Sequence, residues 1–303
     1  MRPVISRAAA LQLALLLTLA APAPAGEQPP LIHAEPSLYR QVLVYGDSYS
    51  RCLCFTRNCK IGRQSCIDLR RPDWLMFEYT QMMLGALLLK PDPSSILVIG
   101  LGGGTLPRTL AKLLPSADID VVEIDPAVVR VAKEYFNYQP DARQHVFEED
   151  GRAYVRRMLR TDKRYALIML DAYDHQYIPE HLLTQEFLAQ VRALLAPSGI
   201  LAANTFSSSR LYQNESVTYR TVFGPFYNLK SANRVILASN APLPTVAQAT
   251  RNVPRFDAAF TALGFAATSV LSLFNTGIDW DPHARVLTDQ YSPANLLNSA
   301  ARQ

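Results

Sequence analysis

Glycines and one acid at a regular spacing form the stretch best suited to binding a ligand. Gly100, Gly102 and Gly104 follow an apolar run at residues 96–99 and precede a helical pattern. Glycine lets a backbone approach a ligand closely and adopt φ values that other residues resist. Glu123 ends a second apolar run about 20 residues later, where a carboxylate can accept hydrogen bonds from ribose hydroxyls. This spacing predicts a nucleoside site, with a purely structural glycine turn as the alternative.

The same pattern indicates which kind of nucleoside is bound. Thr105 stands where a dinucleotide-binding sequence has its third glycine, so the pattern is GxGxG and not GxGxxG. We therefore expect a nucleoside without a pyrophosphate, such as S-adenosylmethionine, in preference to NAD.

Further acids follow the next two apolar runs. Asp150 and Gly151 come after the first of these runs, and Asp171, Tyr173 and Asp174 come after the second. Because the carboxyl ends of parallel strands meet at one edge of a sheet, we expect these side chains to form an acidic crevice. The alternative is that the acids only cap helices and turns, where Asp is common.

Alternating strands and helices must position these residues. This alternation predicts an α/β fold, a doubly wound Rossmann-like sheet of parallel strands with helices on both faces. With the nucleoside that the glycine pattern favours, we expect this sheet to be of the S-adenosylmethionine-dependent methyltransferase type. The expected strands are residues 96–99, 120–124, 145–148, 166–170, 200–203 and 234–239, with helices centred on Leu110, Val131, Val155, Leu188 and Tyr219.

A small antiparallel β unit is expected before this domain. The expected strands are residues 38–45, 51–55 and 65–69, preceded by a linker at residues 26–36 and followed by a helix at residues 74–89. We therefore divide the chain into an N-terminal unit of residues 26–90 and a catalytic domain of residues 91–303.

The first 25 residues have the features of a secretory signal peptide. Arg2 and Arg7 accompany an apolar run at residues 8–21, which a small-residue cleavage sequence follows at residues 23–25. The apolar run is short for a membrane span. We expect export to the periplasm or beyond, with an uncleaved membrane anchor as the alternative.

The four cysteines of the chain are Cys52, Cys54, Cys59 and Cys66. An even number of closely spaced cysteines in an exported chain favours two disulfides, for which three connectivities are possible. A zinc site is the alternative, but the spacings contain no CxxC pair.

Composition excludes some classes of partner. The net charge is +4, and no stripe of lysine and arginine alternates with aromatic residues, so we expect no nucleic-acid partner. We expect no metal.

One further hypothesis is that Asp289, in the closing segment 287–293, folds back over the crevice.

Several of these motifs resemble those of the spermidine synthase (polyamine aminopropyltransferase) family, over roughly residues 38–229. Glu123 lies in a segment similar to the family's VEID, whose glutamate holds the ribose hydroxyls. Asp150 and Gly151 resemble the family's GDG or GDA, whose aspartate contacts the adenine amino group. The segment that starts at Asp171 resembles D-S-x-D, and the segment around Tyr79 resembles the SYQEM helix.

The resemblance implies an aminopropyl transfer from decarboxylated S-adenosylmethionine to a polyamine such as putrescine, in a homodimer. Asp171 would be the base or orienting acid, and Asp174 would bind the acceptor amine. Tyr79 would approach the acceptor, and the ring of Tyr173 could face its charge.

Departures from the family pattern keep other functions open. Gly103 stands where the family has an aspartate that grips the donor's ammonium group, and Thr80 and Ala172 replace a glutamine and a serine. The family's DGxxQ strand is not readable near residues 46–54. The alternatives are therefore an S-adenosylmethionine-dependent methyltransferase and a non-catalytic exported protein that binds a nucleoside or polyamine.

Overall fold

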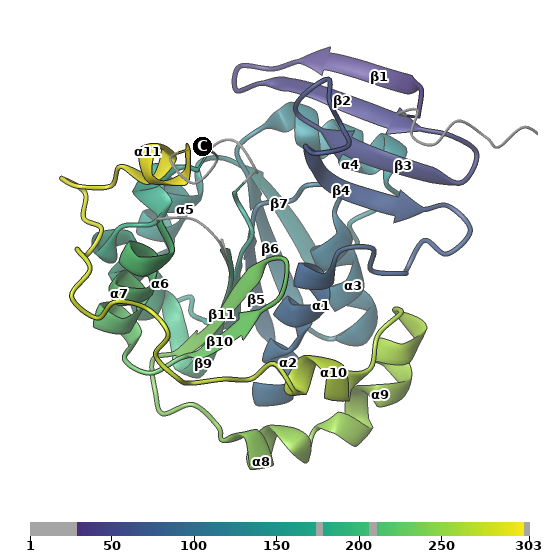
Figure 1. Cartoon of the computed structure of the whole chain (residues 1–303). Coiled ribbons are helices and arrows are strands. Elements are labelled where there is room, and N and C mark those ends of the chain that lie inside the picture. Colours follow the sequence, from purple (N-terminus) through teal and green to yellow (C-terminus); the bar gives the residue numbers. More distant parts are fainter. Residues whose placement is uncertain (1–28, 174–177, 206–210, 300–303) are drawn as a thin grey trace, which may run out of the picture.

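A seven-stranded sheet forms the centre of the protein. The computed structural model describes residues 29–173, 178–205 and 211–299 (Figure 1). The strand order is β10-β11-β9-β8-β5-β6-β7, and the strands from β9 to β7 run parallel. The strands are β5 (Ser95–Ile99), β6 (Asp118–Glu123), β7 (Gln144–Glu148), β8 (Tyr165–Leu170), β9 (Leu195–Thr205), β10 (Tyr227–Lys230) and β11 (Arg234–Ser239).

Helices cover both faces of this sheet, as predicted. Alternate strand residues face opposite sides. Val98 and Met169 pack with α1–α4 and α8–α10, whereas Leu97 and Ile168 pack with α5–α7. The helices are α1 (Glu78–Leu84), α2 (Ala86–Leu89), α3 (Thr105–Leu113), α4 (Pro126–Tyr135), α5 (Gly151–Met158), the 3₁₀ helix η1 (Glu180–Leu182), α6 (Gln185–Leu194), α7 (Leu211–Phe223), α8 (Val246–Thr250), α9 (Val253–Ala262), α10 (Ala267–Leu271) and α11 (Ala294–Ser299). The predicted α/β fold class is therefore confirmed.

Strand β11 differs from the prediction, because it runs antiparallel to β9. The sequence pattern places residues 234–239 among the parallel strands and does not predict β10. Helix α7 leads to β10 at the sheet edge, and a turn at residues 231–233 returns the chain as β11. Such a short turn joins antiparallel strands, so the sheet is mostly and not wholly parallel.

A separate small antiparallel sheet precedes the large one, as predicted, and has four strands where three were expected. Its strands are β1 (Leu31–Pro36), β2 (Gln41–Gly46), β3 (Ser50–Cys54) and β4 (Arg63–Asp68). Strand β1 lies in the expected linker; it is an edge strand without a buried residue, so hydrophobic periodicity does not mark it. One face of the sheet packs on α4 through Val44, Leu53 and Val128 (Figure 1).

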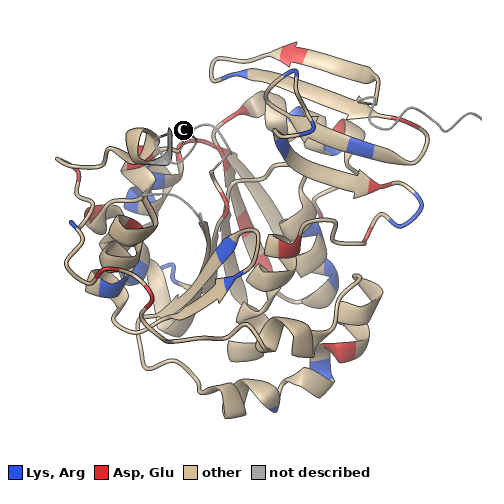
Figure 2. Ribbon diagram, viewed as in Figure 1, with Lys and Arg blue, Asp and Glu red and all other residues tan. Residues whose placement is uncertain are grey.

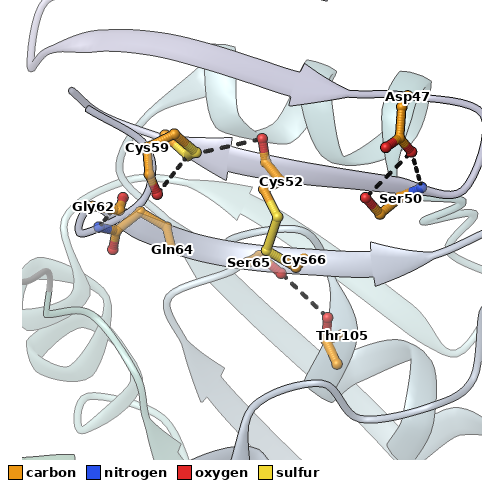
Figure 3. Close-up of a disulfide and its surroundings, with 10 residues drawn as sticks. Asp47, Ser50, Cys52, Cys59, Gly62, Gln64, Ser65, Cys66 and Thr105 are labelled. Atoms are coloured by element: carbon orange, nitrogen blue, oxygen red, sulfur yellow. Dashed lines mark hydrogen bonds between the residues drawn. A yellow bond between two sulfur atoms is a disulfide. The ribbon is translucent and has the colours of Figure 1, made fainter. Parts of the chain in front are cut away.

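Two disulfides cross-link this small sheet. Cys52 pairs with Cys66, and Cys54 pairs with Cys59. Figure 3 shows the first bond joining β3 to β4. The structure thus selects one of the three connectivities and pairs the cysteines with one another instead of placing them around a metal.

Helix α1 begins later than the predicted start at residue 74. Phe77 has an extended backbone, and the helix starts at Glu78. The N–H of Leu75 donates to the carbonyl of Leu263, and the Trp74 ring lies against Gly264. These contacts hold residues 74–77 outside the helix. Helices α1 and α2, which we grouped with the N-terminal unit, pack in the core of the large sheet.

The membrane predictions concern residues 1–25, which lie outside the described residues. Within the described ranges, no helix combines the length and apolar character that crossing a bilayer requires.

Candidate functional site

A cavity of about 260 Å³ lies at the carboxyl ends of β8, β5, β6 and β7. These four strands are neighbours in the sheet, so the residues that follow them meet at one edge. The predicted site residues that line the cavity are Tyr79, Gly100, Gly102, Glu123, Asp150, Gly151, Asp171 and Tyr173. Strand β4 and η1 supply further walls through Ser65 and Leu182. Asp174 lies outside the described residues.

Glu123 links the glycine turn to the end of β6. Its carboxylate accepts the N–H of Leu101 at 2.9 Å and the N–H of Asp125 at 3.0 Å. Burial raises the pKa of Glu123, and these two bonds oppose the rise. Each oxygen can accept a second hydrogen bond, which is what binding a ribose hydroxyl requires.

Gly100 and Gly104 both have a positive φ and no room for a Cβ, but they differ in their relation to the cavity. Gly100 has a φ of 97°, and a Cβ there would lie 2.1 Å from the carbonyl oxygen of Asp171. Gly104 has a φ of 74°, and a Cβ there would lie 2.5 Å from the ring of Tyr138. Gly104 is not among the residues that line the cavity. The predicted ligand contact at Gly104 is thus replaced by a packing role at the start of α3.

Gly103 leaves no room for a side chain. An added Cβ would lie 2.7 Å from Ser65 Oγ and 2.9 Å from the ring of Phe136. Ser65 Oγ lies 3.3 Å from Thr105 Oγ1, a hydrogen bond drawn in Figure 3. Ser65 and Thr105 both line the cavity. Two hydroxyls therefore stand where the resemblance leads us to expect an aspartate.

Asp171 is a carboxylate at the end of β8 with two neutral hydrogen-bond donors. Tyr79 Oη donates to Oδ2 at 3.2 Å, and Asn204 Nδ2 donates to Oδ1 at 3.0 Å. No basic side chain in the described part of the chain contributes to its charge environment. Burial raises the pKa of Asp171 to about 7, although the two bonds oppose the rise. Such a carboxyl can accept a proton near neutral pH.

Asp150 connects the end of β7 to η1. Its Oδ1 accepts the N–H of Ala153 and caps α5, and its Oδ2 accepts from His181 Nε2 at 2.8 Å. The bond from His181 holds the pKa of Asp150 below its usual value. His181 also lines the cavity. The end of the cavity that Asp150 borders therefore has a second polar side chain.

Tyr79 and Tyr173 present aromatic surface in the cavity that Asp171 borders. Tyr173 Oη donates to the carbonyl of Leu182 at 3.2 Å, and the ring of Tyr79 stacks 6.0 Å from that of Phe77. Burial raises the pKa of both hydroxyls well above its usual value, so both tyrosines stay neutral. Neutral rings beside a carboxylate suit a cationic ligand.

Asn204 and His181 are absent from the sequence prediction. Asn204 follows the apolar run at residues 200–203, and a polar residue after a central strand is the signal that identifies Asp171. Our predicted strand ends one residue too early for Asn204 to be noticed, since β9 continues to Thr205. His181 follows no such pattern and reaches Asp150 only through the path of the chain after β8.

In the described ranges, basic side chains are not concentrated at one place, and no metal-binding group is found. Lysine and arginine are dispersed over both sheets and their helices (Figure 2). No group of His, Cys, Asp and Glu side chains in these ranges is arranged to hold a metal ion.

Comparisons with known proteins identify the family. The sequence profile of the spermine/spermidine synthase domain matches residues 76–250. A polyamine aminopropyltransferase from Vibrio vulnificus is 43% identical over 290 residues, which are 94% of this chain and 96% of that protein. This chain belongs to the spermine/spermidine synthase family. The matched domain contains all the predicted site residues, from Tyr79 to Asp174.

Two other proteins are similar to this family member. The spermidine synthase from Thermotoga maritima has the same fold, with a TM-score of 0.59 and 19% identity, over 82% of this chain and 84% of that one. The eEF1A lysine and N-terminal methyltransferase of Bos taurus is 32% identical over 146 residues, which are 43% of this chain and 21% of that protein.

Proposed function

We propose that the protein is a polyamine aminopropyltransferase, which uses decarboxylated S-adenosylmethionine as donor and a polyamine such as putrescine as acceptor. Family membership supports the reaction class. The observation that carries the proposal is the setting of Asp171, a carboxylate in the cavity with a hydroxyl and an amide as its hydrogen-bond donors. A cationic amine would supply the positive charge that the surroundings of Asp171 lack.

The donor nucleoside would lie along the strand ends. Glu123 would accept the ribose hydroxyls with its free lone pairs, and the backbone at Gly100 and Gly102 would approach the nucleoside closely. Asp150 and Gly151 would meet the adenine base. Three strand spacings separate β8 from β7, or about 14 Å, which is the order of length of an adenosine with a short alkyl tail.

Asp171 would prepare the acceptor for attack. An alkylammonium group has a pKa near about 10, so it must lose a proton before its nitrogen can react. Asp171 accepts that proton, and the nitrogen lone pair forms a bond to the methylene carbon beside the sulfonium. The carbon–sulfur bond breaks, its electron pair moves to sulfur, and methylthioadenosine leaves. Holding the amine in line supplies several kcal/mol of the rate enhancement.

The acceptor end would use aromatic surface and a second acid. Tyr79 and Tyr173 would face the acceptor's methylene chain and charge. Asp174 would bind the acceptor's other ammonium group.

Product analysis tests this function. The full chain is incubated with putrescine and either decarboxylated S-adenosylmethionine or S-adenosylmethionine, and the products are identified by mass spectrometry. Release of methylthioadenosine with spermidine is expected. Adenosylhomocysteine would favour a methyltransferase, and calorimetric binding without a product would favour a binding protein. Absence of binding to any adenosine compound would contradict all three functions.

Methyl transfer from S-adenosylmethionine is the second candidate because of Gly103. The donor-gripping aspartate of the family is missing at this position, and Ser65 and Phe136 leave no space for one. Hydroxyls at Ser65 and Thr105 do not select for an ammonium tail as a carboxylate does.

We also propose that the protein is exported and forms a homodimer. The basic and apolar character of residues 1–25 and the two disulfides support export. Large exposed apolar side chains of the small sheet and its loops support a dimer; they are Leu31, Ile32, Leu38, Tyr39, Tyr49 and Ile61. Light scattering measures the oligomer, and mass spectrometry of the protein recovered from a bacterial periplasm measures the mature N-terminus.

A further inference from the structure

The C-terminal segment 287–295 is bound to η1, the short helix that borders the cavity. Ser292 Oγ donates to the carbonyl of Glu180 at 3.0 Å, and Asn295 Nδ2 donates to the carbonyl of Ile178 at 3.0 Å. An apolar cluster joins the segment to α7 and to the residues that flank η1; its buried members are Ile178, Leu183, Leu211, Leu287 and Ala294. We call segment 287–295 the clasp.

One ion pair fastens the clasp to α5. Arg152 Nη1 and Nη2 donate to Asp289 Oδ1 and Oδ2, each at 2.7 Å. Thr184 Oγ1 also donates to Asp289 Oδ1, at 2.7 Å. The side chain of Arg152 is 14% exposed and that of Asp289 is 42% exposed, so the guanidinium of this bidentate pair is shielded from water and the carboxylate is partly hydrated. Arg152 Nη1 donates as well to the carbonyl of His181, at 3.3 Å.

The other side of η1 forms the cavity wall. Pro179, His181 and Leu182 line the cavity, and the imidazole of His181 donates to Asp150. Neither Arg152 nor Asp289 lines it. Helix η1 therefore lies between the clasp and the end of the cavity that we assign to the adenine base.

We infer that the clasp positions η1 for nucleoside binding, and that Arg152 and Asp289 are positioning residues that act through His181. The inference rests on the proposed function, because it assumes that the cavity takes a nucleoside. The sequence hypothesis has Asp289 fold back over the crevice. In the structure the residue does not line the cavity and instead binds Arg152 and Thr184 behind η1.

The physical reason is that η1 cannot hold itself in place. A helical segment of three residues has too few internal hydrogen bonds to be stable alone, so its position depends on its neighbours. Without the Arg152–Asp289 pair, η1 would populate other positions. The nucleoside would then have to order the wall as it binds, which weakens its affinity without changing the reacting groups.

Calorimetric titration of the full chain with methylthioadenosine tests the inference. Asp289→Asn and Arg152→Gln are each expected to raise the Kd about tenfold, a loss of about 1.4 kcal/mol. The matched control is Asp92→Asn, which breaks another two-bond Arg–Asp pair, to Arg255, far from the cavity. This control should change the Kd by less than about twofold.

A positioning role for Arg152 and Asp289 predicts two further results. The kcat at saturating donor should stay within about twofold of wild type while the KM for the donor rises, because the reacting groups are unchanged. The double variant Asp289→Asn/His181→Gln should bind no more weakly than His181→Gln alone, because the two residues act along one path. Arg152→Gln repeats both measurements if Asp289→Asn does not fold.

Three results would overturn the inference. Unchanged binding by both Asp289→Asn and Arg152→Gln would show that the ion pair does not matter. Additive losses in the double variant would show that Asp289 does not act through His181. If wild type itself does not bind methylthioadenosine, the proposed function fails together with the inference, whereas wild-type binding with unaffected variants removes only the inference.

Discussion

Asp120 and Asp171 belong to the same sheet but to opposite kinds of environment. Asp120, in the first half of β6, is 1% exposed, and its Oδ2 accepts from Lys163 Nζ and from the hydroxyls of Tyr154 and Tyr165. Asp171, at the carboxyl end of β8, accepts from one hydroxyl and one amide. One acid has a cation beside it, and the other does not.

The pKa values of the two acids diverge accordingly. Burial favours the protonated form at both positions. At Asp120 the bonds from Lys163 and the two tyrosines outweigh burial and keep the pKa below its usual value. At Asp171 burial prevails, and the pKa rises to about 7. The two acids show that this fold can stabilise a buried carboxylate with a neighbouring cation, as at Asp120, away from the cavity. At Asp171, where a cationic substrate would bind, the fold provides no such cation.

The largest expected effect comes from Asp171→Asn. Turnover should fall about 10²–10⁴-fold, because the variant cannot accept the acceptor's proton. The Kd for methylthioadenosine should change by less than about threefold, since Asp171 is assigned to the amine. Steady-state assays and calorimetry measure the two quantities. Full turnover in this variant would remove Asp171 from the mechanism.

The Asp171→Asn protein should also be more stable than wild type at pH 8. A carboxyl with a raised folded-state pKa costs stability as the pH rises from its unfolded value, about 3.9, toward about 7. Asparagine carries no such cost, so its free energy of unfolding should exceed that of wild type at pH 8 and approach it in acid.

Asp120→Asn should have the reverse effect. Removing the charge weakens the hydrogen bonds from Lys163, Tyr154 and Tyr165, and the free energy of unfolding should fall by about 1.5–3 kcal/mol at pH 7. The pKa of Asp120 is lowered on folding, so this difference is present above about pH 4 and shrinks as the pH falls further. Turnover per folded molecule should be unchanged.

Asp118→Asn is the matched control on the same strand. Asp118 forms an exposed pair with Arg143 and should contribute less than about 1 kcal/mol. Denaturant unfolding measures all three proteins. An Asp120→Asn protein as stable as Asp118→Asn would contradict the claim that Asp120, unlike Asp171, is stabilised by its neighbours.

A third test introduces an aspartate at Gly103, beside the cavity. Gly103→Asp restores the family residue, but its Cβ would meet Ser65 and Phe136. We expect a loss of about 1–3 kcal/mol in unfolding free energy from overpacking, and no decrease in the KM for the decarboxylated donor. The double variant Gly103→Asp/Ser65→Gly relieves one of the two clashes and should recover part of the stability. A lower KM in the single variant would show that the site tolerates the family's donor contact.

The smallest expected effect is a shift in the pH profile. Asn204 donates to Asp171 and lowers the pKa of that carboxyl, so Asn204→Ala should raise it. The acidic limb of kcat/KM should therefore move to higher pH by roughly half to one unit. Asn240→Ala, whose amide bonds the carbonyls of Leu195 and Ala196, is the control and should leave the limb in place.

Local patterns predicted much of the sheet and of the candidate site. The runs before Gly100, Glu123, Asp150 and Asp171 are strands, and their ends meet at one cavity. Prediction failed where strands are marked by neighbours and not by periodicity. Exposed β1 and the edge strand β10 were missed, and β11 was predicted with its correct bounds but with the wrong direction. It also failed at the start of α1, where contacts with Leu263 and Gly264 hold residues 74–77 outside the helix.

The sequence by itself determined which residues end the central strands, because strand periodicity and the positions of glycines and acids are properties of the local sequence. Only the tertiary structure decided what surrounds them. The bond from His181 to Asp150, the packing of Tyr138 on Gly104 and the pairing of Cys52 with Cys66 each join separate segments. The counter-charge that Asp120 has and Asp171 lacks also depends on residues brought near by folding. For that reason the pattern of acids was readable beforehand, and their pKa values were not.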